Sequence, residues 1–189
     1  MLLSSGIIQE GADETHPIHV MHATVEQQVR DSGLGWTFLR PNAFATNAFQ
    51  WLPQIRSGDT VRGVFADAST APIHEDDIVA VAERTLLHDG HDGAVHLLTG
   101  PEAVTHAEQV AAIGRALGRD LRFVEVPPHE AGPDLFPHVP QGMLERFPKT
   151  IGDPAGTEPE ITPTVEKITG SPARTFTEWA EDHAADFRG

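Results

Sequence analysis

Short apolar runs that alternate with segments of helical period are the feature that most constrains this chain. Gly or Pro ends most of the strand-like runs, which cover residues 2–6, 36–40, 60–65, 95–99 and 121–126. Apolar residues three and four positions apart predict helices between or after these runs, at about 22–31, 44–52, 77–85, 105–117 and 175–187. Alternation of this kind predicts an α/β fold with a parallel, doubly wound sheet.

Helix starts can be placed from polar residues that precede the apolar positions. Asp76 or Asp77 is expected to cap the third of these helices. Thr105 with Glu108 forms a capping box at the start of the fourth. Prolines gather in residues 127–163, where we expect loops and one helix near residues 141–147.

Charge and composition exclude several classes of protein. The 189 residues carry 13 Lys plus Arg against 28 Asp plus Glu, a net charge of −15. A surface this acidic repels phosphate backbones and anionic lipids, so neither nucleic acid nor a membrane is an expected partner. The sequence has no Cys, which excludes disulfides and thiolate metal sites. No run approaches the roughly 20 apolar residues of a membrane helix, and no signal peptide is expected, so the predicted location is the cytoplasm.

Ligands of parallel sheets bind outside the carboxyl ends of the strands. Three segments are expected at that edge, namely Ser4-Ser5-Gly6, Pro41-Asn42-Ala43-Phe44 and Thr99-Gly100-Pro101. Adjacent hydroxyls such as those of Ser4 and Ser5 can bond a ligand or satisfy amides of a turn.

Clustered histidines raise the question of a metal. His16, His19 and His22 lie within seven residues, but zinc ligands must converge on one point and His16 precedes a proline. We therefore expect capping or solvated histidines and no metal site. The run from His74 to Asp77 is likewise expected to cap a helix.

His22 and Glu26 share one helical face at positions i and i+4. Such a pair can act as a general acid/base with an orienting partner. It can equally be a surface pair that contributes a few tenths of a kcal/mol. The spacing leaves both readings open.

The same segments, taken in order, resemble a known family. The matching stretches are 2–6, the helix with His22-x-x-x-Glu26, Ser32 to Asn42, Ile73 to Ala82, Leu98 to Glu102, Ala116 to Arg119 and Val165 to Phe176. In these stretches the chain is similar to the NmrA-like atypical short-chain dehydrogenase/reductases, in the branch that contains quinone reductases.

The resemblance implies the second half of a Rossmann-type doubly wound parallel sheet with a small carboxy-terminal substrate domain. Residues 1–126 would form the partial Rossmann-like domain, with substrate-domain segments at about 53–75 and 119–126. Residues 127–189 would form a proline-rich lid and the last helix. The family's glycine-rich turn for the cofactor pyrophosphate has no counterpart in the sequence. The chain therefore resembles a carboxy-terminal half, which would leave Leu2 and Leu3 exposed and would pair with a missing amino-terminal half or with a second copy.

The resemblance also implies the site residues. Ser4 and Ser5 would lie near the nicotinamide, and Pro41, Asn42, Ala43 and Phe44 would line its other side. His22 and Glu26 stand where other short-chain dehydrogenases carry Tyr and Lys. Members of the quinone-reductase branch likewise carry His and Glu at these two positions. Because the sequence has no Tyr, catalysis by a Tyr–Lys pair is excluded, and His22 would supply the proton.

The function implied is transfer of a hydride from NADPH or NADH, with NADPH favoured, to a quinone or another small electrophile. This chain alone is not expected to hold the cofactor stably. Two alternatives remain open at this point, a non-catalytic dinucleotide sensor and an inactive fragment.

Overall fold

The computed structural model describes residues 1–9, 11–127, 130–131, 135 and 158–188. The chain divides into two compact units. Unit 1 comprises Met1–Ala45, Ala71–Glu102 and Glu160–Thr175, and unit 2 comprises Thr46–Thr70, Ala103–Pro159 and Phe176–Gly189. The division expected at residue 126 stays a prediction, and the helix expected near residues 141–147 lies outside the described residues.

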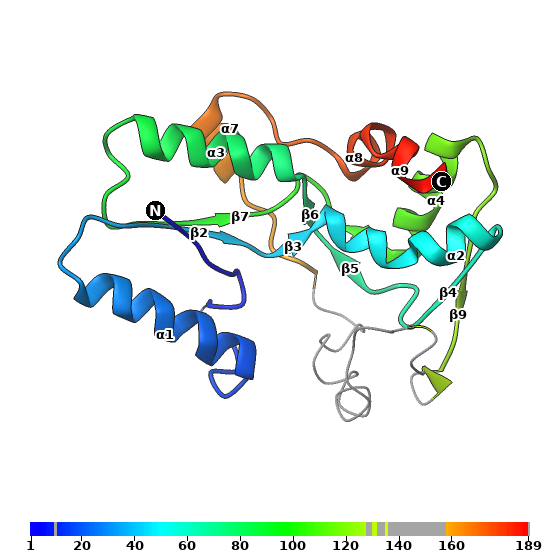
Figure 1. The fold of residues 1–189 in the computed structure, drawn as a ribbon, viewed down its shortest axis with the longest axis horizontal. Coiled ribbons are helices and arrows are strands. Elements are labelled where there is room, and N and C mark those ends of the chain that lie inside the picture. Colours follow the sequence, from blue (N-terminus) through cyan, green and yellow to red (C-terminus); the bar gives the residue numbers. More distant parts are fainter. Residues whose placement is uncertain (10, 128–129, 132–134, 136–157, 189) are drawn as a thin grey trace. The chain divides into compact units, whose positions relative to one another are not determined.

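A three-stranded parallel sheet organises unit 1 (Figure 1). Its order is β1 (Leu2–Leu3), β2 (Thr37–Pro41) and β7 (Ala94–Leu98), with β1 at the edge. Leu2 is half-buried there and Leu3 is 49% exposed. The parallel strands and the helices between them confirm the α/β class expected from the alternating pattern.

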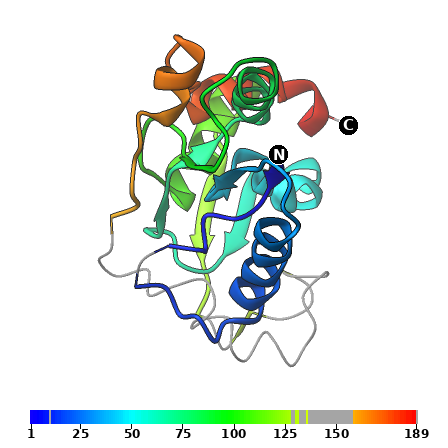
Figure 2. The ribbon, with the colours of Figure 1, turned by 90° about the vertical axis from the view of Figure 1, so that its left-hand side faces the viewer.

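Helices lie on opposite faces of this sheet, as Figures 1 and 2 show for α1 (Pro17–Asp31) and α3 (Glu75–Leu87). Successive strand residues point to opposite faces. Arg40 of β2 therefore meets α1, whereas Leu39 packs toward α3. The buried cluster on the α3 side consists of Leu39, Ile73, Ile78, Val81, Leu98 and Val165.

The start of α1 corrects the sequence prediction, which placed it near His22. The helix begins at Pro17, because His16 caps it by accepting a hydrogen bond at Nδ1 from the amide of Ile18, at 3.3 Å. A proline in the first turn costs nothing, since its missing N–H would have no partner there. His16 is therefore a capping histidine, as expected.

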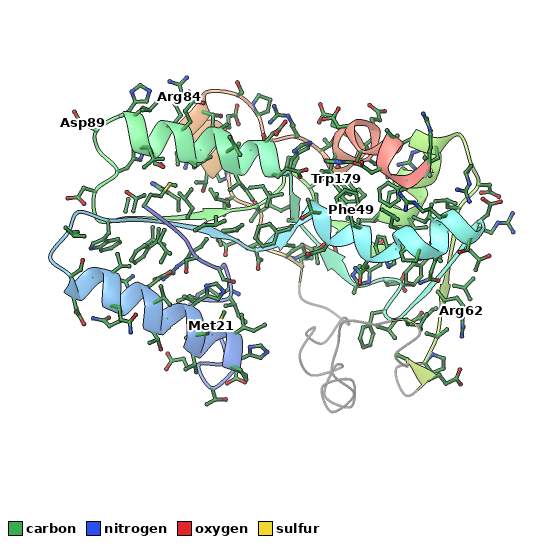
Figure 3. All side chains as sticks on the ribbon, viewed as in Figure 1. Met21, Phe49, Arg62, Arg84, Asp89 and Trp179 are labelled. Carbon is green, nitrogen blue, oxygen red and sulfur yellow. The ribbon has the colours of Figure 1, made fainter. Side chains whose placement is uncertain are left out.

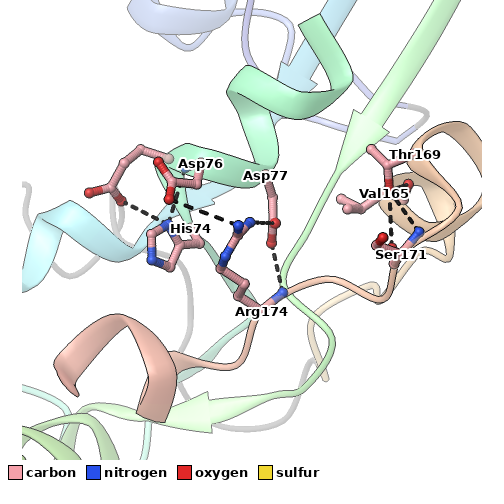
Figure 4. A network of polar contacts seen from close by, with 8 residues as sticks. His74, Asp76, Asp77, Val165, Thr169, Ser171 and Arg174 are labelled. Atoms are coloured by element: carbon pink, nitrogen blue, oxygen red, sulfur yellow. Dashed lines mark hydrogen bonds and ion pairs between the residues drawn. The ribbon is translucent and has the colours of Figure 1, made fainter. Parts of the chain in front are cut away.

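The cap of α3 also differs from the prediction of Asp76 or Asp77. His74 is the capping residue, and its Nδ1 accepts from the amide of Asp76 at 3.1 Å. Asp77 is instead buried, and its carboxylate accepts hydrogen bonds from the guanidinium and from the backbone amide of Arg174 (Figure 4). This contact ties the segment around residue 174 to the first turn of α3.

Three short elements complete unit 1. β3 (Ala43–Phe44) pairs in parallel with β6 (Pro72–Ile73), and α7 (Thr164–Thr169) packs against α3. Gly100 follows β7 and lies against the backbone of Pro72, where a Cβ would stand 2.1 Å from the carbonyl oxygen. Only glycine permits this approach, which brings the segment after β7 close to β6.

Unit 2 combines helices with two small sheets. β4 (Thr60–Gly63) pairs in parallel with β9 (Arg122–Glu125), and β5 (Ser69–Thr70) pairs antiparallel with β8 (Val104–Thr105). Among the described residues its helical segments are η1 (Ala45–Trp51, which begins at the last residue of unit 1), α2 (Leu52–Ser57), α4 (His106–Leu117), α8 (Phe176–Asp182) and α9 (Ala184–Arg188). The capping box predicted for Thr105 and Glu108 is present. The helix predicted at 44–52 is a 3₁₀ segment that passes into α2.

The core of unit 2 is aromatic. Phe176, Trp179 and Phe187 are buried, as their helical spacing predicts, and Phe49 stands 5.2 Å from Trp179 between ring centroids (Figure 3). The predicted single helix at 175–187 is interrupted, since α8 ends at Asp182 and α9 begins at Ala184. Within the described residues no helix has the length and apolar character needed to cross a bilayer.

Candidate functional site

The segments that follow β1 and β2 lie side by side at the carboxyl edge of the unit 1 sheet. The Ser4 amide donates to the Leu39 carbonyl at 2.7 Å, and the Gly6 amide donates to the Pro41 carbonyl at 2.8 Å. Gly6 stands so close to Asn42 that a Cβ would lie 2.8 Å from the Asn42 Cα. The edge predicted from the sequence thus brings Ser4-Ser5-Gly6 and Pro41-Asn42 together.

The third predicted segment joins the same edge. The Asn42 amide donates to the Leu98 carbonyl at the end of β7, at 3.1 Å, so Thr99 and Gly100 continue from a strand that ends beside Asn42. Thr99 is buried, and its Oγ1 accepts from the Thr162 amide at 2.9 Å. Its hydroxyl is therefore engaged within the fold.

Exposure separates the six candidate cofactor-binding residues. Asn42 is exposed and Ser5 is half-buried, so their side chains are accessible at the edge. Ser4 and Pro41 are buried, whereas Ala43 is half-buried in β3. Phe44 is also half-buried and packs against the cluster around Ile73, so part of its ring serves the core. Their roles toward a cofactor stay predictions.

The Ser5 side chain is held by a turn. Its Oγ accepts from the Ile7 amide at 3.3 Å, and its carbonyl accepts from the Ile8 amide at 3.2 Å. The turn from Ser5 to Ile8 therefore sets where this hydroxyl stands at the sheet edge.

Glu26 is fully buried between α1 and β2. Its Oε1 accepts from Arg40 Nε at 2.8 Å, and its Oε2 accepts from Arg40 Nη2 at 2.6 Å and from Arg30 Nη2 at 3.1 Å. The Ser4 hydroxyl is buried and forms no hydrogen bond of normal geometry within the described part of the chain, yet it is near enough to favour the charged carboxylate.

These contacts decide the charge of Glu26. Burial raises the pKa of the carboxyl, but the hydrogen bonds from Arg40, the nearby Ser4 hydroxyl and the charges of Arg40 and Arg30 outweigh it. The pKa of Glu26 is therefore lowered, and the side chain is a carboxylate at neutral pH. A proton-donating role for Glu26 has no support in this geometry.

His22 lies one turn before Glu26 on α1 and is half-buried. Among the described residues no hydrogen bond or ion pair engages its ring, and Glu26 turns to Arg40 instead. The neighbouring His19 is buried. The catalytic roles of His22 and Glu26 stay predictions, but a direct His22–Glu26 pair is not formed.

Arg40 is the residue that sequence reasoning missed. It stands in a buried strand between Leu39 and Pro41, where an unpaired cation would be costly, and it therefore requires an acidic partner. Glu26 on the inner face of the preceding helix could have been proposed as that partner from this signal.

Relatives among characterised proteins match most of this chain. It is 41% identical over 163 residues to the (4-alkanoyl-5-oxo-2,5-dihydrofuran-3-yl)methyl phosphate reductase of Streptomyces griseus, covering 86% of this chain and 58% of that protein. It is 33% identical over 193 residues to the NAD(P)H azoreductase of Xenophilus azovorans, covering 98% of this chain and 65% of that protein. The chain thus spans less than two thirds of these relatives' length.

Solved structures share the fold. The NADPH complex of the Escherichia coli quinone oxidoreductase QOR2 matches with a TM-score of 0.72 and 23% identity, over 88% of this chain and 59% of the other. NmrA, a negative transcriptional regulator solved with NAD, matches with a TM-score of 0.59 and 20% identity, over 87% and 57%.

No family model matches the sequence. Identity to the reductases and the fold shared with QOR2 and NmrA nevertheless agree with the residues that carry the resemblance. The chain resembles the NmrA-like atypical short-chain dehydrogenase/reductases in these sequence stretches and in fold.

Proposed function

We propose that the whole protein is an NAD(P)H-dependent oxidoreductase, with NADPH favoured, that reduces a quinone or another small electrophile. The observation that carries this proposal is the convergence of Ser4-Ser5-Gly6 and Pro41-Asn42 at the carboxyl edge of a parallel sheet. Ligands of open parallel sheets bind at this edge. The names of the relatives support the reaction class, since one is a reductase of a dihydrofuranylmethyl phosphate and another is an NAD(P)H azoreductase.

The residues at this edge fit the nicotinamide end of the cofactor. The edge offers a hydroxyl on Ser5 and an amide on Asn42, and both side chains are accessible. The pyrophosphate has no matching glycine-rich motif in these 189 residues. When bound, the reduced nicotinamide supplies a hydride. Ser5 and Asn42 would orient its ring through hydrogen bonds.

His22 is the proposed proton donor. Reduction of a quinone by one hydride gives a hydroquinone anion, which needs one proton on oxygen to complete the product. An imidazole can donate a proton as a general acid, and among the described residues no hydrogen bond or ion pair engages the ring of His22. Glu26, as a buried carboxylate paired with Arg40, supplies no proton in this scheme.

The experiment is an NADPH titration of the purified chain by calorimetry, followed by an assay of NADPH oxidation with a water-soluble benzoquinone. Saturable binding together with quinone-dependent oxidation supports the proposal. His22→Gln should lower turnover about 100-fold, within the range for a lost general acid, with little change in NADPH affinity. His88→Gln is the matched control, because His88 is an exposed histidine at the end of α3.

A dinucleotide sensor is the second candidate. The sequence has no Tyr, and the fold is shared with NmrA, a regulator solved with NAD. NADPH binding without oxidation by any quinone would favour this role over the reductase.

A further inference from the structure

Arg40 uses each of its nitrogens within the protein. Nε and Nη2 donate to the two carboxylate oxygens of Glu26, and Nη1 donates to the carbonyl of Ile8 at 2.7 Å. A guanidinium that grips a carboxylate through two parallel bonds is held in a fixed plane. The direction of the third bond, to Ile8, is therefore set by Glu26.

Ile8 closes the turn that carries Ser5. Its amide donates to the Ser5 carbonyl, and the turn is tied at its start by the Gly6 amide to Pro41. Arg40 ties the other end of the turn through the Ile8 carbonyl. The two ends of the Ser5–Ile8 turn are thus attached to β2, one through the backbone and one through Arg40.

We infer that Glu26 and Arg40 are positioning residues that hold the Ser5–Ile8 turn in the form that receives the nicotinamide end of the cofactor. This inference rests on the proposed function. It gives Glu26 a role through Arg40 and the turn, with no contact to substrate or cofactor, and it adds Arg40 to the residues on which the site depends.

Charge and shape both matter in this arrangement. Glu26 is fully buried and Arg40 is 15% exposed, so removing either partner leaves the other charge poorly solvated. Lysine could pair with Glu26 but cannot reach two carboxylate oxygens and a carbonyl in one plane. Arg30, whose side chain is 33% exposed, also contacts Glu26 at 3.1 Å, but in the part of the chain that the structure describes no hydrogen bond joins Arg30 to the turn.

The experiment compares Arg40→Met, Arg40→Lys and Glu26→Gln with the matched control Arg30→Gln. Hydrogen exchange of the backbone amides of residues 5–9 reports the turn, and calorimetry reports the affinity for NADPH. In Arg40→Met we expect these amides to exchange about tenfold faster or more, and NADPH to bind about tenfold more weakly. Arg40→Lys should recover part of both effects. Arg30→Gln should leave both within about twofold of wild type.

Exchange of the α3 amides shows that a variant is folded, and Arg40→Lys keeps the test decisive where Arg40→Met does not fold. Wild-type exchange at residues 5–9 in folded Arg40→Met or Arg40→Lys overturns the inference. Faster exchange with unchanged NADPH affinity also overturns it, while the proposed function stands because the wild type binds. Failure of the wild type to bind NADPH refutes cofactor binding by this chain, and the positioning role falls with it.

Discussion

The contact between Asp77 and Arg174 offers a stability test that separates a backbone anchor from an ion pair. Asp77 is buried at 2% exposure, and its Oδ2 accepts from the Arg174 amide at 2.7 Å. Its Oδ1 accepts from the guanidinium, which is 41% exposed. The perturbations are Asp77→Ala, which removes both bonds, and Asp77→Asn, which keeps an oxygen for the amide.

The magnitudes follow from these two bonds. A backbone amide left without an acceptor costs about 1–2 kcal/mol. Loss of the guanidinium contact costs about 1 kcal/mol, because Arg174 is 41% exposed and water solvates it when the partner is gone. We therefore expect Asp77→Ala to lower the free energy of unfolding by about 2–3 kcal/mol and Asp77→Asn by about 1 kcal/mol.

Urea unfolding followed by circular dichroism measures both changes. Asp76→Asn is the control, since Asp76 is 61% exposed and stands 3.9 Å from Arg174, so its effect should stay within about 0.5 kcal/mol. An Asp77→Asn cost equal to that of Asp77→Ala would refute the reasoning, because the amide would then not be the main anchor.

Three further outcomes are expected. Thr105→Ala removes the capping box of α4 and should lower the free energy of unfolding by about 1 kcal/mol in urea; an unchanged midpoint would contradict the cap. The pKa of His96 is lowered by burial and by the neighbouring charge of His91, so its stability contribution is complete above the unfolded value of 6.5 and is lost as the pH falls below it. His96→Gln should therefore flatten the loss of stability between pH 7 and pH 5 in thermal melts, and an identical slope would argue against this. Gly6→Ala places a Cβ 2.8 Å from the Asn42 Cα and should cost about 1–3 kcal/mol while weakening NADPH binding; wild-type behaviour in both assays would mean that the edge is looser than described.

The sequence predicted correctly those element boundaries that depend on a few neighbouring residues. The strand at 37–41 ends near Pro41 as expected, and α4 begins after the capping box at Thr105. The predicted start of α1 near His22 was wrong because proline is favoured in the first helical turn, and the helix begins at Pro17. The predicted cap of α3 was also wrong. An imidazole nitrogen of His74 accepts the hydrogen bond that caps the helix, where a carboxylate of Asp76 or Asp77 was expected.

Parallel strands made the meeting of Ser4-Ser5-Gly6 with Pro41-Asn42 predictable, because strands that run together end at one edge. The same reasoning could not settle what Glu26 binds. Spacing on α1 put His22 and Glu26 on one face, and both a surface pair and an acid/base pair satisfied that spacing.

The sequence by itself determined the α/β class, the buried apolar faces of α3 and α4, and the meeting of Ser4-Ser5-Gly6 with Pro41-Asn42 at one edge of the sheet, because these depend on periodicity and chain direction. Only the tertiary structure decided the partners of buried charges. Glu26 pairs with Arg40, 14 positions away, and Asp77 pairs with Arg174, 97 positions away. A buried carboxylate takes whichever cation the packing of distant elements brings within reach, and no local pattern records that choice.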